Sequence, residues 1–110
     1  MNTENSQAQM RKGVLELCIL AILAKEDSYV PDIIDTLKTS SLIVVEGTIY
    51  PLMTRLKNDG YLTYSWAEST SGPPRKYYKL TARGKTLLKD LKKSWEDLVD
   101  SVGNIIQAQS

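Results

Sequence analysis

Apolar residues along the first forty positions follow a helical period. They predict a first helix over Gln7–Lys25, apolar on nearly all sides, which we expect to be buried on several faces. A second, shorter helix is predicted over Tyr29–Lys38. Ser28 is its expected N-cap, and Pro31 is its third residue, where a missing N–H costs little. The buried face of this second helix is predicted to consist of Ile33, Ile34 and Leu37.

The next helical pattern contains a proline. A short apolar piece, Leu42–Val45, reads as extended, and helical spacing then continues to Asn58-Asp59-Gly60. Pro51 lies inside that pattern. Proline removes an amide donor and crowds the carbonyl four residues back, which destabilises a helix by about 3 kcal/mol when the proline is in its interior. Spacing alone leaves two interpretations open. The helix begins at Pro51, or it begins earlier and presents Pro51 on its outward face.

The period then changes from helical to alternating. Residues 61–67 and 75–80 alternate, and a run of turn formers, Glu68–Pro74, separates them, which predicts a β-hairpin with a long exposed tip. Thr81 is expected to cap a last helix running from Ala82 to about Gln107. Two helices joined by a tight link, a third helix and a hairpin describe a winged helix-turn-helix. The predicted fold is therefore mostly α with a small β-hairpin, extended by a long C-terminal helix.

Composition narrows the function classes. The chain has 110 residues, enough for one small domain, with a formal net charge of +1. It has no histidine, and its one cysteine, Cys18, lies in an apolar run where a buried small hydrophobe is expected. We therefore expect no metal site, no cofactor and no enzyme activity. No signal peptide is visible, and the apolar run Val14–Ala24 is too short to span a bilayer, so we expect no membrane association and a cytoplasmic location.

Two separated motifs resemble one known family. They are "EGTIYPLMTRLKNDGYL" (46–62) and "SGPPRKYYKLTARG" (71–84), in that order along the chain. Together they resemble the PadR family of bacterial transcriptional regulators, and the resemblance covers most of the chain. The short C-terminal part is similar to the small subgroup with a single C-terminal helix, some members of which regulate multidrug export.

The resemblance implies that Glu46–Asp59 is the recognition helix, with Pro51 in its second turn. A recognition helix presents its first turns to DNA, where the proline ring could touch a thymine methyl. Two departures from the family pattern stand out. Val44 and Val45 offer no side-chain cap before this helix, and Tyr29-Val30-Pro31 stands where the family commonly has a glycine.

The resemblance also implies which residues contact DNA. Thr48, Tyr50 and Pro51 are assigned to the major groove, and Arg55 and Lys57 mainly to phosphates. The wing residues Arg75, Lys76 and Tyr77 are assigned to the neighbouring minor groove, with a wing tip stiffened by Gly72 and two prolines. Three alternatives stay open: Lys57 and Lys79 are solvated surface charges, Tyr77 packs, and Tyr78 belongs to the core. From Glu46 to Lys79 five basic and three acidic residues give a local charge of +2, which suits a dimer that doubles it.

The last helix has a heptad-like apolar seam. A helix this long cannot bury its wide apolar stripe against so small a domain, so we expect a second copy of the same helix as its partner. The chain then divides into a winged helix-turn-helix region, residues 1–81, and a dimerisation helix, residues 82–110, packed with the first helix. An antiparallel pairing would set the basic half of one last helix against the acidic half of the other. The predicted interface consists of Leu88, Leu91, Trp95, Leu98, Val102 and Ile105.

Trp95 lies in the middle of this seam and has two interpretations. It packs in the dimer interface, or, as the resemblance implies, paired tryptophans flank a pore and stack on a planar aromatic effector. Met10, Leu17 and Val99 fall where the multidrug-binding subgroup lines its pocket. Three functions follow: a ligand-responsive repressor on an inverted-repeat operator, a DNA-binding regulator without an effector, and a winged-helix module that binds a protein and no DNA.

Overall fold

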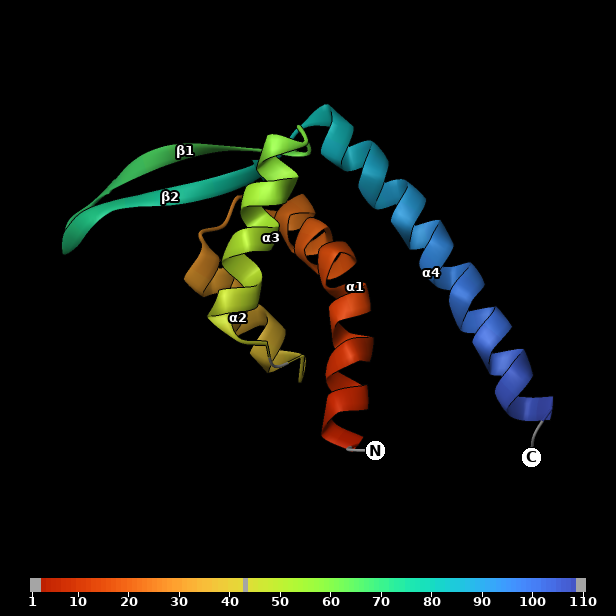
Figure 1. Ribbon diagram of the computed structural model, residues 1–110. Coiled ribbons are helices and arrows are strands. Elements are labelled where there is room, and N and C mark those ends of the chain that lie inside the picture. Colours follow the sequence, from red (N-terminus) through yellow and green to blue (C-terminus); the bar gives the residue numbers. More distant parts are fainter. Residues whose placement is uncertain (1–2, 43, 109–110) are drawn as a thin grey trace.

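The computed structural model describes residues 3–42 and 44–108. This part of the chain forms four helices and one antiparallel hairpin, and the hairpin projects away from the helices like a wing (Figure 1). The predicted winged helix-turn-helix with a long last helix is confirmed. The elements are α1 (Thr3–Lys25), α2 (Val30–Thr39), α3 (Glu46–Asn58), β1 (Leu62–Ser69), β2 (Gly72–Leu80) and α4 (Ala82–Ala108).

One hydrophobic core holds the first three helices and the base of the hairpin together. Helix α1 contributes four buried residues from its C-terminal half and begins four residues earlier than predicted. The core gains most of its stability from burying aliphatic side chains, about 1.5–3 kcal/mol each. The largest fully buried side chains are Ile19, Leu20, Ile33, Leu37, Ile49, Met53 and Leu56.

The start of α2 differs from the prediction. Its N-cap is Tyr29, which makes no side-chain capping hydrogen bond, and Pro31 is the second helical residue rather than the third. Ser28 instead pairs through its backbone with Tyr78 of β2, with N–H···O distances of 3.1 and 2.8 Å, and its Oγ donates to the Glu26 carbonyl. Ser28 was predicted as a cap because it precedes the apolar period, but the bridge to β2 fixes its backbone in another role.

Helix α3 begins before its proline. Val45 is an extended N-cap without a side-chain hydrogen bond, as the missing cap residue predicted, and the helix runs through Pro51. The interpretation in which the helix begins at Pro51 is therefore wrong. The predicted extended piece before it includes Ile43, which lies outside the described residues, and the described residues Leu42, Val44 and Val45 form no strand.

The hairpin alternates as predicted, but its tip is shorter. Leu62 pairs with Leu80 and Tyr64 with Tyr78, and the ladder continues with one bulge to Ser69 opposite Gly72. Only residues 70 and 71 form the turn. The prolines at 73 and 74, predicted in the tip, lie in β2. Edge strands tolerate proline because the missing N–H faces no partner there.

Thr81 ties the end of α3, the hairpin and α4 together. Its Oγ1 donates to the Gly60 carbonyl at 2.7 Å and accepts from the Gly84 amide at 3.0 Å, so the predicted cap of α4 is confirmed. Its own N–H donates to the Tyr61 carbonyl. Gly60 has a φ of 88°, which glycine adopts without strain. Gly84 lies so close to Tyr61 that a Cβ there would stand 2.1 Å from the Tyr61 carbonyl oxygen.

Helix α4 is long and mostly uncovered. It packs against α1 near its start and extends beyond the core, giving extents of 56 × 32 × 22 Å (Figure 1). Leu88 and Leu91 are half-buried against the core, whereas Leu98 and Ile105 are 54 % and 64 % exposed. The first part of the predicted seam is therefore covered within this chain, and the second part is open.

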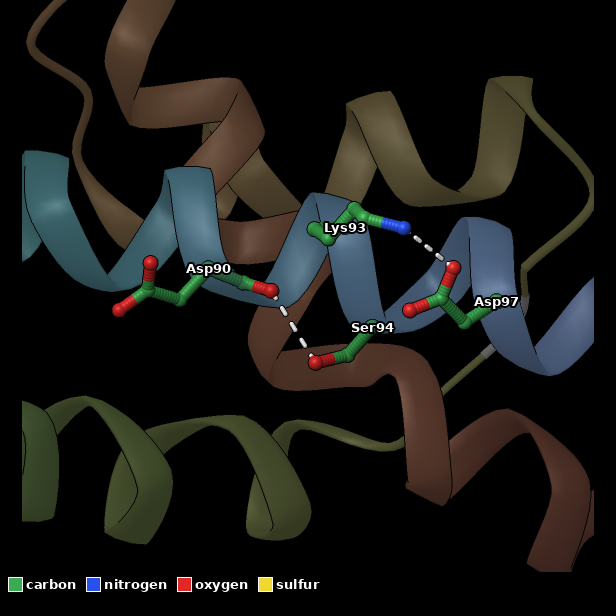
Figure 2. A network of polar contacts seen from close by, with 4 residues as sticks. All are labelled: Asp90, Lys93, Ser94 and Asp97. Atoms are coloured by element: carbon green, nitrogen blue, oxygen red, sulfur yellow. Dashed lines mark hydrogen bonds and ion pairs between the residues drawn. The ribbon is translucent and has the colours of Figure 1, made fainter.

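Polar side chains on α4 satisfy one another locally. Lys93 Nζ lies 2.5 Å from Asp97 Oδ1, and Ser94 Oγ donates to the Asp90 carbonyl at 3.1 Å (Figure 2). The hydrogen bond from Lys93 to Asp97 raises the lysine's pKa. These two charges, one from each half of the helix, already neutralise each other within one chain. They therefore contribute less to an antiparallel pairing than the charge pattern predicted.

Candidate nucleic-acid interface

The outward face of α3 is a stripe of four exposed residues. Their spacing of 4, 3 and 4 places them opposite the buried Ile49 of the same helix. Pro51 lies in this stripe, so its ring faces solvent, as the recognition-helix interpretation requires. Thr54 and Asn58 were missed from the sequence, although the helical period counted from Pro51 identifies them. The stripe consists of Gly47, Pro51, Thr54 and Asn58.

Thr48 and Tyr50, which the sequence analysis grouped, lie on opposite flanks of α3. Tyr50 is 46 % exposed and faces the wing. Thr48 is half-buried beside the N-terminal half of α1, in a groove of about 160 Å³ that Arg11 and Lys12 also line. The grouping failed because two residues two positions apart differ by about 200° around a helix. No local sequence signal linked Arg11 and Lys12 to α3.

Arg55 lies between two carboxylates. Its guanidinium is 3.5 Å from Glu16 Oε2 of α1 and 3.8 Å from Asp59 Oδ2 of its own helix. About half of the Arg55 side chain is exposed, so it remains accessible to a phosphate. The sequence assigned Arg55 to phosphates but did not anticipate this competition, because Glu16 is 39 positions away.

The wing presents different cations on its two faces. Arg75 and Tyr77 share one face with the residues they pair with, Ala67 and Ser65, whereas Lys76 pairs with Trp66 on the other. Alternation along a strand separates neighbours in this way. The predicted trio Arg75, Lys76 and Tyr77 is therefore not a single contact surface.

Arg75 is held by two tyrosines. Its guanidinium carbon lies 4.7 Å from the centre of the Tyr29 ring, and the Tyr29 and Tyr77 rings are 5.7 Å apart. A side-chain hydrogen bond with Tyr77 raises the pKa of Arg75, and Tyr29 acts in the same direction. Tyr29, at the start of α2, was missed from the sequence because only the fold brings it to the wing.

Lys76 lies over aromatic rings on the other face. Its ammonium is 4.0 Å from the Tyr64 ring centre, 5.2 Å from that of Tyr78 and 6.0 Å from that of Trp66. Lys57 of α3 lies 5.6 Å from the same Tyr64 ring, so it is positioned by the wing as well as by its own helix. Tyr78 is buried, which confirms that it belongs to the core.

Three elements surround one concave surface. The start of α2, Tyr50 of α3 and the wing tip around Gly72 enclose a space of about 380 Å³, with Arg75 and Lys76 at its border. Its lining includes serine and tyrosine residues and two basic residues, whose side chains are of the types that proteins use on phosphate oxygens. Residues 3–42 and 44–108 contain no cluster of metal-ligating side chains, and within them no helix is long and apolar enough to cross a membrane.

A second candidate surface lies between α1 and α4. Trp95 is 44 % exposed and borders a cleft of about 140 Å³ together with Leu17 and Glu16. The predicted pair Leu17 and Trp95 is therefore brought together. Met10 and Val99 are exposed, and neither lines this cleft within one chain.

The profile of the Transcriptional regulator PadR-like family matches residues 19–90, from the C-terminal part of α1 into α4. The chain belongs to this family. Members of the PadR-like family are DNA-binding regulators of transcription and not enzymes, so the chain is a transcriptional regulator. The resemblance stated from the two motifs is confirmed.

Solved PadR-like structures share both the fold and much of the sequence. A PadR-like transcription factor from Bacteroides fragilis is 58 % identical, with a TM-score of 0.75, over 92 % of this chain and 98 % of that one. A PadR family transcriptional regulator from Eggerthella lenta is 31 % identical with a TM-score of 0.81, covering 94 % and 87 %. A PadR-like transcriptional regulator from Bacillus cereus is 38 % identical with a TM-score of 0.79, covering 90 % and 97 %.

An uncharacterised protein from Lysinibacillus sphaericus is also similar, with 28 % identity over 94 residues, which cover 83 % of this chain and 86 % of that protein. Because the PadR-like match includes α2, α3 and the hairpin, it covers the whole concave surface described above. Membership in a family of DNA-binding regulators favours a DNA-binding function over a protein-only interaction module.

Proposed function

We propose that this PadR-like regulator is a dimeric repressor that acts in the cytoplasm, binds an inverted-repeat operator and is released by a planar aromatic effector. The observation that supports DNA binding most directly is the arrangement of α3 and the wing. The helix presents Pro51 outward, and Lys57 of α3 and Lys76 of the wing both lie near the Tyr64 ring.

In this proposal α3 enters the major groove with its outward stripe. Pro51 and Tyr50 meet base edges, joined by Thr54 and Asn58, whose polar side chains can exchange hydrogen bonds with bases. Thr48 lies beside Arg11 and Lys12 on the protein surface. In this arrangement it contacts the sugar-phosphate backbone at the edge of the DNA major groove rather than the bases at its centre. Lys57, Arg55 and the wing cations contact phosphates, and Tyr77 and Gly72 support the wing at the minor groove.

Selection of bound sequences from a random duplex pool tests operator recognition. We expect an inverted repeat whose half-sites are about one helical turn apart, or a multiple of that spacing. Tyr50→Ala should relax the selected sequence, whereas Ser101→Ala, on α4, should leave it unchanged. Selection of no common sequence by the folded wild-type protein would contradict the proposal.

The open half of the α4 stripe supports the dimer. Leu98, Val102 and Ile105 are exposed at helical spacing in one chain, and an apolar stripe of this length is typical of an interface between helices. We propose that the same stripe of a second copy covers it. In that dimer the two copies of α3 would be related by a twofold axis, which matches an inverted repeat.

The cleft beside Trp95 supports the effector. A volume of about 140 Å³ in one chain is small for a drug-sized molecule, so the site requires the second copy to complete it. Titration with a panel of planar aromatic dyes should quench Trp95 and spare Trp66, which lies on the wing. Trp95→Ala should abolish this quenching and keep the dimer. Loss of the dimer in Trp95→Ala would support the alternative, in which Trp95 is an interface packing residue.

A further inference from the structure

Two lysines from different elements converge on one aromatic ring. Lys57 of α3 lies 5.6 Å from the Tyr64 ring centre, and Lys76 of β2 lies 4.0 Å from it. Their separation cannot exceed the sum of these two distances. Attraction to the ring face positions each ammonium group and costs neither its charge nor its hydrogen-bonding capacity.

Neither lysine has an ion-pair partner among residues 3–42 and 44–108. In the part of the chain that the structure describes, no carboxylate lies within 4.0 Å of either ammonium group, whereas Arg55 has two such partners. Two uncompensated cations near one ring repel each other, and an anion that both ammonium groups can reach would offset that repulsion. Unlike Arg55, this pair is therefore available to bind an anion without first breaking an ion pair.

We propose that Lys57 and Lys76 share a single phosphate of the DNA backbone, and that Tyr64 is the positioning residue that holds the two lysines at it. The inference rests on the DNA-contacting surface proposed above. It adds that the recognition helix and the wing are locked to the same phosphate, which fixes how far α3 enters the major groove. Tyr64 touches no base in this arrangement and acts only through the two lysines.

A double-mutant cycle tests whether the phosphate is shared. Binding of a labelled mixed-sequence duplex is measured by fluorescence anisotropy over a range of salt concentrations, for wild type, Lys57→Gln, Lys76→Gln and the double variant. If one phosphate is shared, each single variant should weaken binding about threefold and the double variant about thirtyfold. In the double variant, the slope of log binding constant against log salt concentration should then fall by about one unit. If the lysines contact separate phosphates, the losses should multiply and the slope should fall by about two units, which would overturn the inference.

A matched cycle with Lys79 provides the control. Lys79 lies on the opposite face of the wing, paired with Thr63, so Lys57→Gln and Lys79→Gln should act independently. Coupling of equal size in this control cycle would show a general charge effect and would also overturn the inference.

The role of Tyr64 has its own test. Tyr64→Phe keeps the ring and should retain the coupling between the two lysines, whereas Tyr64→Leu should abolish it while the thermal unfolding temperature stays that of a folded protein. Coupling that persists in folded Tyr64→Leu would remove Tyr64 from the proposal. If Tyr64→Leu does not fold, the cycle in the Tyr64→Phe background decides, because lost coupling there contradicts a role for the ring. Failure of wild-type protein to bind any duplex would instead refute the proposed DNA-contacting surface.

Discussion

At the scale of single residues, Arg55 connects the two candidate surfaces. Its partner Glu16 also borders the cleft beside Trp95. A carboxylate near a phosphate-contacting arginine weakens the attraction of that arginine to DNA. Within the proposed interface Glu16 therefore competes for Arg55, and a molecule that moved Glu16 would change the charge that α3 presents.

We expect Glu16→Gln to strengthen DNA binding about 1.4- to 5-fold, because a partly exposed ion pair of this kind is worth about 0.2–1 kcal/mol. The measurement is an anisotropy titration at fixed salt. Glu26→Gln is the matched control, since it changes the net charge equally on an exposed residue outside the contacts of Arg55. Equal gains from both variants would show that only total charge matters.

Cys18 gives a prediction that depends on pH. Partial burial raises the pKa of its thiol, and only the thiolate reacts with alkylating reagents. We expect iodoacetamide to label the folded protein slowly, with a rate that rises at higher pH than in the denatured chain.

Because the folded state holds the proton more tightly, thiol ionisation should lower the free energy of unfolding as pH rises through the pKa of the unfolded thiol. Equal pH profiles for folded and denatured protein would contradict this.

At the scale of elements, two glycines of α4 should respond oppositely to the same change. Gly84→Ala would force a Cβ against the Tyr61 carbonyl, so we expect a loss of about 1–3 kcal/mol in the free energy of unfolding. At Gly103 an added Cβ meets nothing within 4 Å, and alanine should stabilise the helix by up to about 1 kcal/mol. Denaturant unfolding of both variants measures the contrast. If Gly103→Ala destabilised the protein and Gly84→Ala did not, the start of α4 would not pack against the Tyr61 carbonyl as described.

The elements also show what the sequence could and could not predict. Period and turn residues identified all four helices and the hairpin because each signal is local. Ser28 was misassigned because its backbone pairs with β2, fifty positions away. The wing tip was predicted too long because β2 is an edge strand that accepts prolines.

In the candidate site, too, residues with a local sequence signal were predicted, and residues that depend on long-range packing were not. Pro51, Lys57 and Lys76 were identified from the two motifs, and their exposure or half-exposure agrees with a surface role. Tyr29, Glu16 and the two faces of the wing could not be predicted, since each depends on segments that only tertiary packing brings together.

At the scale of the whole molecule, the α4 stripe gives a test of the dimer. Leu91 is half-buried against its own core, so a charge there would disturb folding as well as assembly. Leu98→Asp combined with Ile105→Asp places charges only on the open part of the stripe. We expect a folded monomer, because burying an unpaired charge in an interface costs several kcal/mol.

Light scattering gives the mass, and circular dichroism checks the helix content. Asn104→Asp adds a charge on a different face of α4 and should leave the dimer intact. A dimer that survives the double substitution would show that another surface holds the two copies together.

The bonds made by Thr81 have a mechanical consequence. They fix the base of α4 to the end of α3 and to the hairpin, so we expect the helix to move as a rigid arm about its base. With 27 residues the arm is about 40 Å long, and a rotation of about five degrees at its base moves its far end by about 3.5 Å. Conversely, in the proposed dimer a shift of that size between the two copies of α4 would tilt each copy of α3 by a few degrees. In the proposed dimer, the spacing of the two DNA half-sites would therefore depend on the angle at which the Thr81 hydroxyl holds α4.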